Sequence, residues 1–122
     1  GNVNMWPTAD SYDGLWKKYG PKNIRVHYQW GRGNGYCLNA YNPSQGSNVN
    51  VYTCDLSDPE QHWDIVTING DTKQIRLKGT AFCLNAYQAS QGSNINLWTC
   101  NPGVTDQWFE REYRTVVVLP GD

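Results

Sequence analysis

The sequence predicts an all-β protein built from repeated units, and three observations predict this class. The segment Tyr36–Cys54 returns 46 residues later as Phe82–Cys100, and 14 of 29 positions are identical between residues 36–64 and 82–110. Short alternating or apolar runs, bounded by Gly, Pro, Asn, Asp or Ser, recur along the chain and are typical of a β-sandwich or barrel. Helical periodicity is hard to find. Because a repeated unit carries any site in copies, the pattern favours multivalent binding over one catalytic centre.

Ten runs have the length and composition of β-strands. In chain order they are Val3–Trp6, Ile24–Tyr28, Tyr36–Ala40, Val49–Thr53, Trp63–Ile68, Ile75–Lys78, Phe82–Ala86, Ile95–Thr99, Phe109–Arg114 and Val116–Leu119. Two Gly-containing segments between runs, Gln45-Gly46-Ser47 and Asn69-Gly70-Asp71, predict hairpin turns.

The bulk properties fit one soluble globular domain. The 122 residues suffice for a modest core, and the net charge of −1 gives no general attraction to nucleic acid or anionic membrane. No apolar run approaches the length of a membrane span. Six Trp and eight Tyr are an excess of side chains that combine an apolar face with a polar group.

The four cysteines form two pairs, each spaced 17 apart and at the same place in each repeat. One disulfide per repeat, Cys37–Cys54 and Cys83–Cys100, is the economical interpretation, and each bridge would stabilise the fold by about 3 kcal/mol. The alternative is a metal site built from four thiolates, but no closely spaced C-x-x-C pair is present. We therefore expect disulfides, no metal and no cofactor, and a secreted or extracellular protein.

The whole chain, residues 1–122, is predicted to be one domain of three units. Residues 24–68 and 75–114 form two complete units, and residues 1–19 correspond to the last two strands of a third. Thr115–Leu119 could supply the opening strand of the partial unit, which would make the order a circular permutation. The alternative is that the front of the domain was removed. The first unit has an insertion, residues 29–35, that the second lacks.

The repeated motif resembles the ricin B-chain-like lectin family. The resemblance covers residues 24–114 well and residues 2–16 in part. It implies a β-trefoil with up to one shallow sugar pocket per repeat, and it places Trp16, Trp63 and Phe109 in the core. The motifs that carry it are Cys37-Leu-Asn39, Tyr52-Thr-Cys54 and Gln61-His-Trp63, echoed by Cys83-Leu-Asn85, Trp98-Thr-Cys100 and Gln107-Trp-Phe109.

A sugar has a patch of C–H bonds on one face and hydroxyls around its edge, so a binding site needs an aromatic ring beside amides or carboxylates. The resemblance assigns the ring to the aromatic residue two positions before the second cysteine. It assigns the polar edge to the residue after Cys-Leu and to the residue before the Gln of Gln-x-Trp, with that Gln bridging pocket and scaffold. The resulting candidates are Tyr52, Asn39, Glu60 and Gln61; Trp98, Asn85, Asp106 and Gln107; and Trp6 and Asp13 in the partial unit.

This chain departs from the family pattern at both polar positions. The usual Asp after Cys-Leu is replaced by Asn39 and Asn85, and the usual Asn before Gln is replaced by Glu60 and Asp106. Donor and acceptor capacity is roughly kept, but the preferred hydroxyl pattern could differ. Galactose specificity is therefore not carried over directly.

Other interpretations remain open. The candidate side chains could serve only the scaffold, and Tyr28 and Trp30 at the insertion could form a contact surface or a plain hairpin extension. The two histidines show no metal spacing, no nucleophile motif occurs, and nothing favours a glycosidase carboxylate pair, so we expect no enzyme. We expect a glycan-binding lectin, free-standing or attached to a toxin or glycoside hydrolase chain. The alternatives are a protein-interaction subunit of a toxin complex with degenerate pockets and, more weakly, a trefoil protease inhibitor.

Overall fold

The computed structural model describes residues 16–26, 35–70, 72–87 and 94–110. Within these ranges the chain forms nine strands and two 3-10 turns, which confirms the all-β prediction. The bounds are β1 (Trp16–Tyr19), β2 (Asn23–Val26), β3 (Tyr36–Asn39), β4 (Asn50–Thr53), η2 (Pro59–Gln61), β5 (Trp63–Asn69), β6 (Thr72–Leu77), β7 (Phe82–Asn85), β8 (Asn96–Thr99), η3 (Thr105–Gln107) and β9 (Phe109–Glu110).

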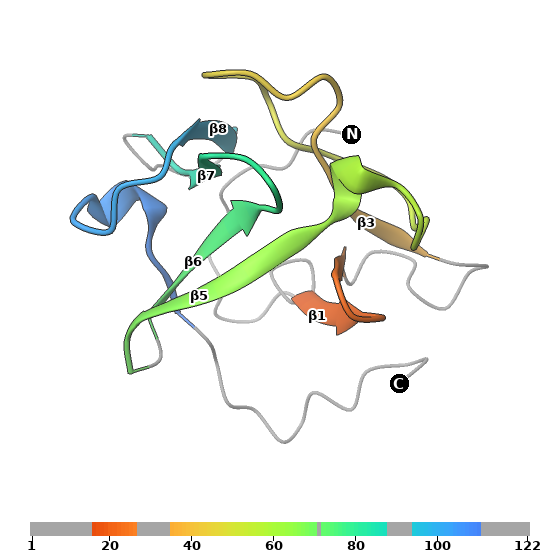
Figure 1. Ribbon diagram of the computed structural model, residues 1–122, viewed down its shortest axis with the longest axis horizontal. Helices are drawn as coiled ribbons and strands as arrows, with labels where there is room; N and C mark the ends of the chain where they lie inside the picture. The colour runs from red at the N-terminus through yellow and green to blue at the C-terminus, as the bar shows by residue number, and fades with distance from the viewer. Residues whose placement is uncertain (1–15, 27–34, 71, 88–93, 111–122) are drawn as a thin grey trace.

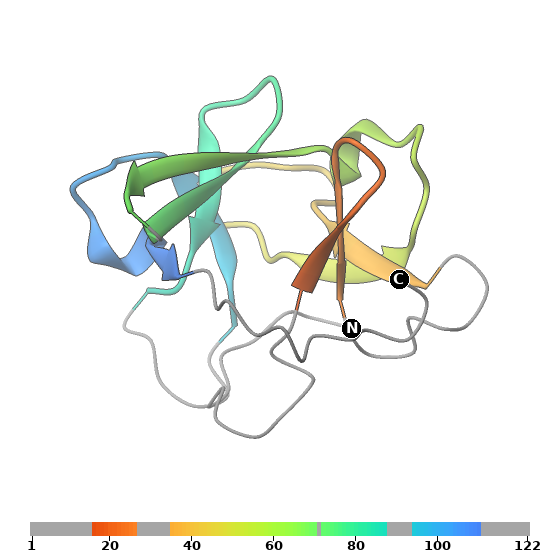
Figure 2. The same ribbon diagram turned by 90° about the horizontal axis from the view of Figure 1, so that it is seen from below.

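The strands form two antiparallel sheets. One sheet has the order β1-β2-β3-β4, and the other has the order β5-β6-β7-β8 with β9 paired to β6. The long β5–β6 hairpin passes between the labelled β1 and the β7–β8 pair in Figure 1. The view from below in Figure 2 shows the β1–β2 hairpin and the β7–β8 hairpin as separate units beside it.

The two segments predicted to be turns do connect consecutive strands. Gly70 has φ +51° and lies between β5 and β6, and Gly46 has φ +83° and lies in the connection between β3 and β4. Glycine adopts this left-handed region without the steric cost that a side chain adds. The turn at Gly46 is closed by a hydrogen bond of 3.1 Å from Ser47 N to Ser44 O.

One aromatic residue begins a strand in each part of the fold: Trp16 in β1, Trp63 in β5 and Phe109 in β9. Trp63 is 1% exposed, and the other two are half-buried and pack against the same core. The ring centroids of Trp16 and Phe109 lie 6.1 Å apart. The buried indole of Trp63 donates from Nε1 to Leu38 O at 3.1 Å. The prediction that these three residues belong to the core is confirmed.

Both predicted disulfides are present, Cys37–Cys54 and Cys83–Cys100. Each bridge ties the first strand of a hairpin, β3 or β7, to the residue that follows the second strand, β4 or β8. Both bridges are sequence-local, with a separation of 17 residues, so they stiffen each unit internally and do not link the units.

Three features of the fold differ from the predicted elements. The strand β1 is absent from the predicted runs, because Trp-Lys-Lys-Tyr shows no apolar alternation, and the turns η2 and η3 are not predicted by any pattern. β6 begins at Thr72 rather than Ile75, because Lys73 and Thr72 continue the ladder with β5 and β9. The runs Val3–Trp6 and Val116–Leu119, and the insertion with Tyr28 and Trp30, lie mainly outside the described residues.

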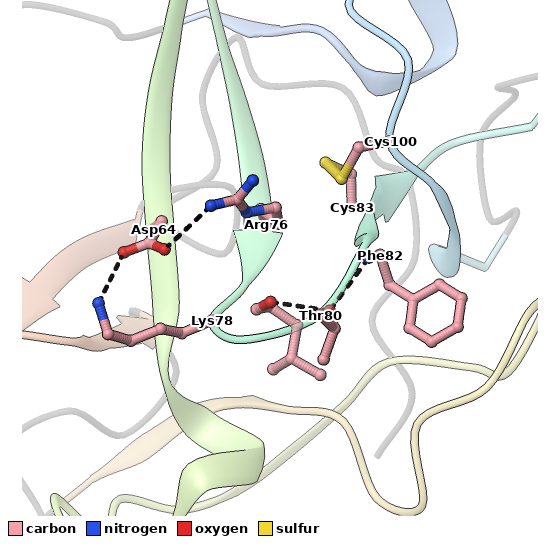
Figure 3. A network of polar contacts seen from close by, with 8 residues as sticks. Asp64, Arg76, Lys78, Thr80, Phe82, Cys83 and Cys100 are labelled. Atoms are coloured by element: carbon pink, nitrogen blue, oxygen red, sulfur yellow. Dashed lines mark hydrogen bonds and ion pairs between the residues drawn. A yellow bond between two sulfur atoms is a disulfide. The ribbon is translucent and has the colours of Figure 1, made fainter.

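The β5–β6 hairpin and the turn that follows it carry a polar network (Figure 3). Asp64 forms ion pairs with Arg76 at 3.7 Å and with Lys78 at 3.3 Å. The Thr80 hydroxyl donates to Leu77 O at 2.8 Å and accepts from Phe82 N at 3.0 Å, which directs the chain from β6 into β7. Because the ion pairs are partly exposed, their contribution to stability is small, at most about 1 kcal/mol each.

Candidate functional site

The first candidate site lies on one face of the β3–β4 hairpin. The register pairs Cys37 with Tyr52 and Asn39 with Asn50. Side chains two residues apart on a strand share a face, so Asn39, Asn50 and Tyr52 lie on the same side as the disulfide. Asn39 is 5% exposed and Tyr52 is 64% exposed, so an accessible ring stands beside a nearly buried amide.

A short amide–amide hydrogen bond fixes the polar end of this face. Nδ2 of Asn39 donates to Oδ1 of Asn50 at 3.0 Å. The second unit repeats the arrangement, because Nδ2 of Asn85 donates to Oδ1 of Asn96 at 3.1 Å. The oxygen and nitrogen of each amide are therefore oriented by the fold.

The second candidate site lies on the β7–β8 hairpin. Its register pairs Cys83 with Trp98 and Asn85 with Asn96, as in the first unit. Asn85 is 4% exposed, whereas the indole of Trp98 is 46% exposed. An exposed ring is what the stacking hypothesis requires of Trp98.

The turns η2 and η3 bring Glu60 and Asp106 to the same ends of these hairpins, where their main-chain carbonyl groups accept hydrogen bonds. Ala40 N donates to Glu60 O at 2.8 Å, and Ala86 N donates to Asp106 O at 2.8 Å. Glu60 therefore lies beside Ala40, which follows Asn39, and Asp106 lies beside Ala86, which follows Asn85. The two turns thereby unite Asn39 with Glu60, and Asn85 with Asp106.

In the first unit the carboxylate is also fixed by a loop. Oε2 of Glu60 accepts from Asn42 N at 2.9 Å. Asn42 has φ +46°, an uncommon conformation that asparagine tolerates better than most residues. The bond occupies one carboxylate oxygen, and no residue in the described ranges donates a hydrogen bond to Oε1.

The two motif glutamines, Gln61 and Gln107, lie inside the scaffold and are 0% and 1% exposed. Oε1 of Gln107 accepts from Gln74 Nε2 and Asn101 N, and Nε2 donates to Thr99 O. Gln61 makes the corresponding bonds to Asn23, Asp55 and Thr53. These bonds tie η2 and η3 to the strands, and direct contact of either glutamine with a ligand stays a prediction.

The loop after each second cysteine is held by its own side chains. The hydroxyl and the backbone N–H of Ser57 both donate to Asp55 Oδ1, and they hold the pKa of Asp55 below its ordinary value. Nε2 of His62 lies 2.8 Å from Leu56 O, and in the second unit Nε1 of Trp108 donates to Pro102 O at 2.9 Å. His62 and Trp108 therefore brace equivalent loops.

Sequence reasoning missed two kinds of residue at the sites. Asn50 and Asn96 orient the site amides, and Tyr41 and Tyr87 are 69% and 62% exposed close to them in sequence. All four are identical between the two copies, and this identity of polar and aromatic residues was the signal that could have found them. Trp6 and Asp13 lie outside the described residues.

No group of three or more His, Cys, Asp or Glu suited to holding a metal ion occurs in the described ranges. In the same ranges, no helix has the length and apolar character needed to cross a membrane.

The sequence was compared with known families and structures. The pattern of the ricin-type β-trefoil lectin domain matches residues 30–119. The chain belongs to this lectin family. No curated protein matches it.

Two solved structures similar to this ricin-type lectin domain extend the comparison. The hemolytic lectin CEL-III shares 26% identity at a TM-score of 0.71, over 93% of this chain and 25% of that one. The designed threefold symmetric protein ThreeFoil shares 19% identity at a TM-score of 0.70, over 88% of this chain and 77% of that one, and shows similarity of fold alone. The predicted β-trefoil is confirmed. The chain spans about a quarter of CEL-III.

Proposed function

We propose that this ricin-type domain binds carbohydrate at two shallow sites, one on the β3–β4 hairpin and one on the β7–β8 hairpin. The observation that carries the proposal is the exposed Trp98 beside an oriented amide, Asn85, and a carboxylate-bearing turn at Asp106. The first unit offers Tyr52, Asn39 and Glu60 in the same arrangement. The family and the lectin CEL-III support the substrate class.

Binding at each site would combine two contacts. The apolar face of a pyranose stacks on the ring of Trp98 or Tyr52, and this contact excludes water from C–H groups. Hydroxyls at the sugar edge donate to Glu60 or Asp106 and exchange hydrogen bonds with Asn39 or Asn85. Each asparagine already donates one N–H to its partner, so it offers the ligand mainly its oxygen and its second N–H.

Single shallow sites of this kind bind weakly, with dissociation constants around the millimolar scale. A protein with two sites on one rigid body binds with avidity when a glycan surface presents several sugar units. The two disulfides support a function in an oxidising, extracellular compartment. A partner toxin chain or glycoside hydrolase would use the domain to concentrate on its target surface.

The Trp98→Ala variant tests this function. Variant and wild type are compared on a glycan array, and the affinity for each sugar that the wild type binds on the array is then measured by calorimetry. Loss of a stacking contact of about 1.4 kcal/mol weakens binding at that site about tenfold. Trp108→Ala is the matched control, because Trp108 has a similar exposure, 41% against 46%, but braces the loop at Pro102.

Trp108→Ala should retain glycan binding. Equal affinity of Trp98→Ala and the wild type would contradict the proposed site. A wild-type protein that retains no glycan but captures a protein partner would favour the interaction-subunit alternative.

A further inference from the structure

The outer edge of β4 has main-chain groups that face away from its partner strand. Cys54 N donates to Gly35 O at 2.9 Å, and hydrogen-bonded pairs alternate along an antiparallel ladder. The bonded pairs are therefore 35/54, 37/52 and 39/50. The N–H and C=O groups of Val51 and Thr53 consequently point outward, to the edge of the sheet.

The equivalent edge in the second unit, on β8, is occupied by a segment of the first unit. Gly46 N donates to Leu97 O, and Leu97 N donates to Ser47 O, both at 2.8 Å. The side chain of Gln45 completes the contact, because its Oε1 accepts from Thr99 N and Thr99 Oγ1 at 3.0 Å each. A Gln-Gly-Ser turn thus docks on the edge of β8 through main-chain and side-chain hydrogen bonds.

The edge of β4 offers the same groups in the same order. Val51 corresponds to Leu97, and Thr53 is identical to Thr99. Within the described ranges, nothing pairs with the N–H or C=O of Val51, or with the N–H and hydroxyl of Thr53. Thr53 O accepts from Gln61, as Thr99 O accepts from Gln107, so the two edges also share their scaffold contact.

A cavity of about 500 Å³ lies against this edge. Its lining residues combine exposed apolar and aromatic side chains with two carboxylates: Tyr19, Tyr52, Thr53, Cys54, Asp55, Leu56 and Asp58. Leu56 is 52% exposed and packs toward Gly20. None of the residues that the structure describes occupies this edge in the first unit, whereas Gln45–Ser47 occupies the equivalent edge in the second.

We propose that the β4 edge and this cavity form a docking groove for the Gln-Gly-Ser segment of a ricin-type repeat on another polypeptide chain. The chain itself specifies the ligand, because Gln45–Ser47 already bind the equivalent groups on β8. The incoming glycine N–H donates to Val51 O, and the serine C=O accepts from Val51 N. The glutamine amide oxygen accepts from the N–H and hydroxyl of Thr53. Added strands of this kind gain affinity from main-chain hydrogen bonds and specificity from one side chain.

The probe is a synthetic peptide with the sequence of residues 43–50, Pro-Ser-Gln-Gly-Ser-Asn-Val-Asn, added to the full 122-residue chain labelled with nitrogen-15. We expect saturable shifts of the Val51 and Thr53 amide signals, with a dissociation constant on the order of millimolar. The same peptide with Ala in place of Gln should bind about tenfold or more weakly.

The variant Thr53→Pro removes both the N–H and the hydroxyl, so Val51 is the remaining reporter, and its amide should no longer shift with peptide. The dispersion of the spectrum reports whether the variant folds. Residues 2–8 of the partial unit correspond in sequence to residues 48–54, so Pro7 stands at the position of Thr53 and the chain already carries proline there. The proposal would be overturned if the peptide caused no shifts of the wild-type Val51 and Thr53 amides. It would also be overturned if the peptide with Ala in place of Gln caused the same shifts at the same concentrations.

Two measurements on the wild type give further grounds for rejection. Amide exchange at Val51 and Thr53 as slow as at Leu97 and Thr99, without peptide, would mean that this chain already fills the groove. Sugar stacked on Tyr52 would itself shift the amides of its neighbours Val51 and Thr53, so competition is the discriminating measurement, and displacement of the peptide by the retained sugar would assign the groove to saccharide instead. Rapid exchange without peptide, and peptide binding that persists at saturating sugar, support a site that is separate from the glycan sites.

Discussion

The buried glutamine of each Gln-x-aromatic motif is a branching point between three parts of its unit. Gln107 bonds to β6 through Gln74, to the end of β8 through Thr99 and to the following loop through Asn101. Because the side chain is 1% exposed, water cannot replace a lost partner. The motif is therefore primarily a structural device, placed directly next to the acidic site residue.

Gln107→Leu should lower the free energy of unfolding by about 3 kcal/mol. The apolar side chain leaves Gln74 Nε2, Asn101 N and Thr99 O with one partner fewer, and buried polar groups without partners are costly. Urea denaturation followed by tryptophan fluorescence measures the change.

The neighbouring Asp106→Asn variant is the control for Gln107→Leu, and it should change stability by less than about 0.5 kcal/mol because Asp106 is partly exposed. A Gln107→Leu protein as stable as the wild type would show that the amide is dispensable.

The role of an individual residue could be predicted from sequence where its motif occurs in both units, or where it is one of two cysteines that can form a disulfide. The disulfide pairing and the exposure of Trp98 follow from spacing and from the family pattern. The partner of Asn39 could not be predicted, since Asn50 becomes its neighbour only through the register of β3 and β4. The burial of Gln61 likewise depends on Asn23, 38 residues away.

Among the elements, β4 and β8 are equivalent hairpin strands with different surroundings. The outer edge of β8 carries residues 45–47, which link the two sheets. Two of the four hydrogen bonds in this link involve the side chain of a single residue, Gln45. This contact therefore combines two main-chain hydrogen bonds with two bonds to a single side-chain oxygen. It adds to the other contacts between the units, which include the pairing of β5 with β6 and the bond from Val49 N to Ile95 O.

Gln45→Ala should loosen the link without unfolding either unit. We expect the amide of Thr99 to exchange hydrogen about fivefold to tenfold faster, because a net loss of about 1 kcal/mol eases local opening. Hydrogen exchange measured by NMR tests this.

Ser44→Ala is the matched control for Gln45→Ala, because the Ser44 contacts to Ser47 use its backbone and leave its own hydroxyl aside. If Thr99 exchanges at the wild-type rate in Gln45→Ala, the side chain does not hold the two units together.

Elements were predictable where local signals are strong. Asn69-Gly70 gave the β5–β6 hairpin, because glycine relieves the strain of the left-handed turn. The strand β1 is absent from the predicted runs, since Lys17 and Lys18 break the apolar alternation. Only the correspondence of residues 1–19 with the last two strands of a unit indicates a strand there, and it pairs with β2. The 3-10 turns have no periodic signature: η2 is capped by the bond from Glu60 N to Asp58 Oδ1, whereas η3 follows Val104 and has no side-chain cap.

At the scale of the whole molecule, the trefoil could be predicted because one unit is copied with its core aromatic, disulfide and turn. The contact of Trp16 with Phe109 joins segments from the two ends of the described chain. Such a contact follows from pseudo-threefold packing and from no local property of either segment. The arrangement of the partial unit stays a prediction.

Each disulfide should stabilise the molecule to a similar extent, because both close loops of the same length. C37A/C54A and C83A/C100A should each lower the free energy of unfolding by about 3 kcal/mol. The variant with all four replacements should lose about the sum if the bridges act independently.

Thermal and urea denaturation of the three variants measure these losses. A loss below about 1 kcal/mol for either pair would contradict the loop-closure account. A combined loss well above the sum would reveal that the units fold cooperatively.

The close approach of Gly46 to Trp98 has a consequence for how the two proposed sugar sites differ. A side-chain carbon added at Gly46 would lie 3.5 Å from Cζ3 of the indole, so the backbone of one unit lies against the ring of the next. That ring is already partly immobilised before any ligand arrives, and less rotational freedom is lost when a sugar stacks on it. Tyr52 is more exposed than Trp98. The second proposed site is thus preorganised by its neighbour, and the two sites of one molecule would fill in sequence as the glycan concentration rises.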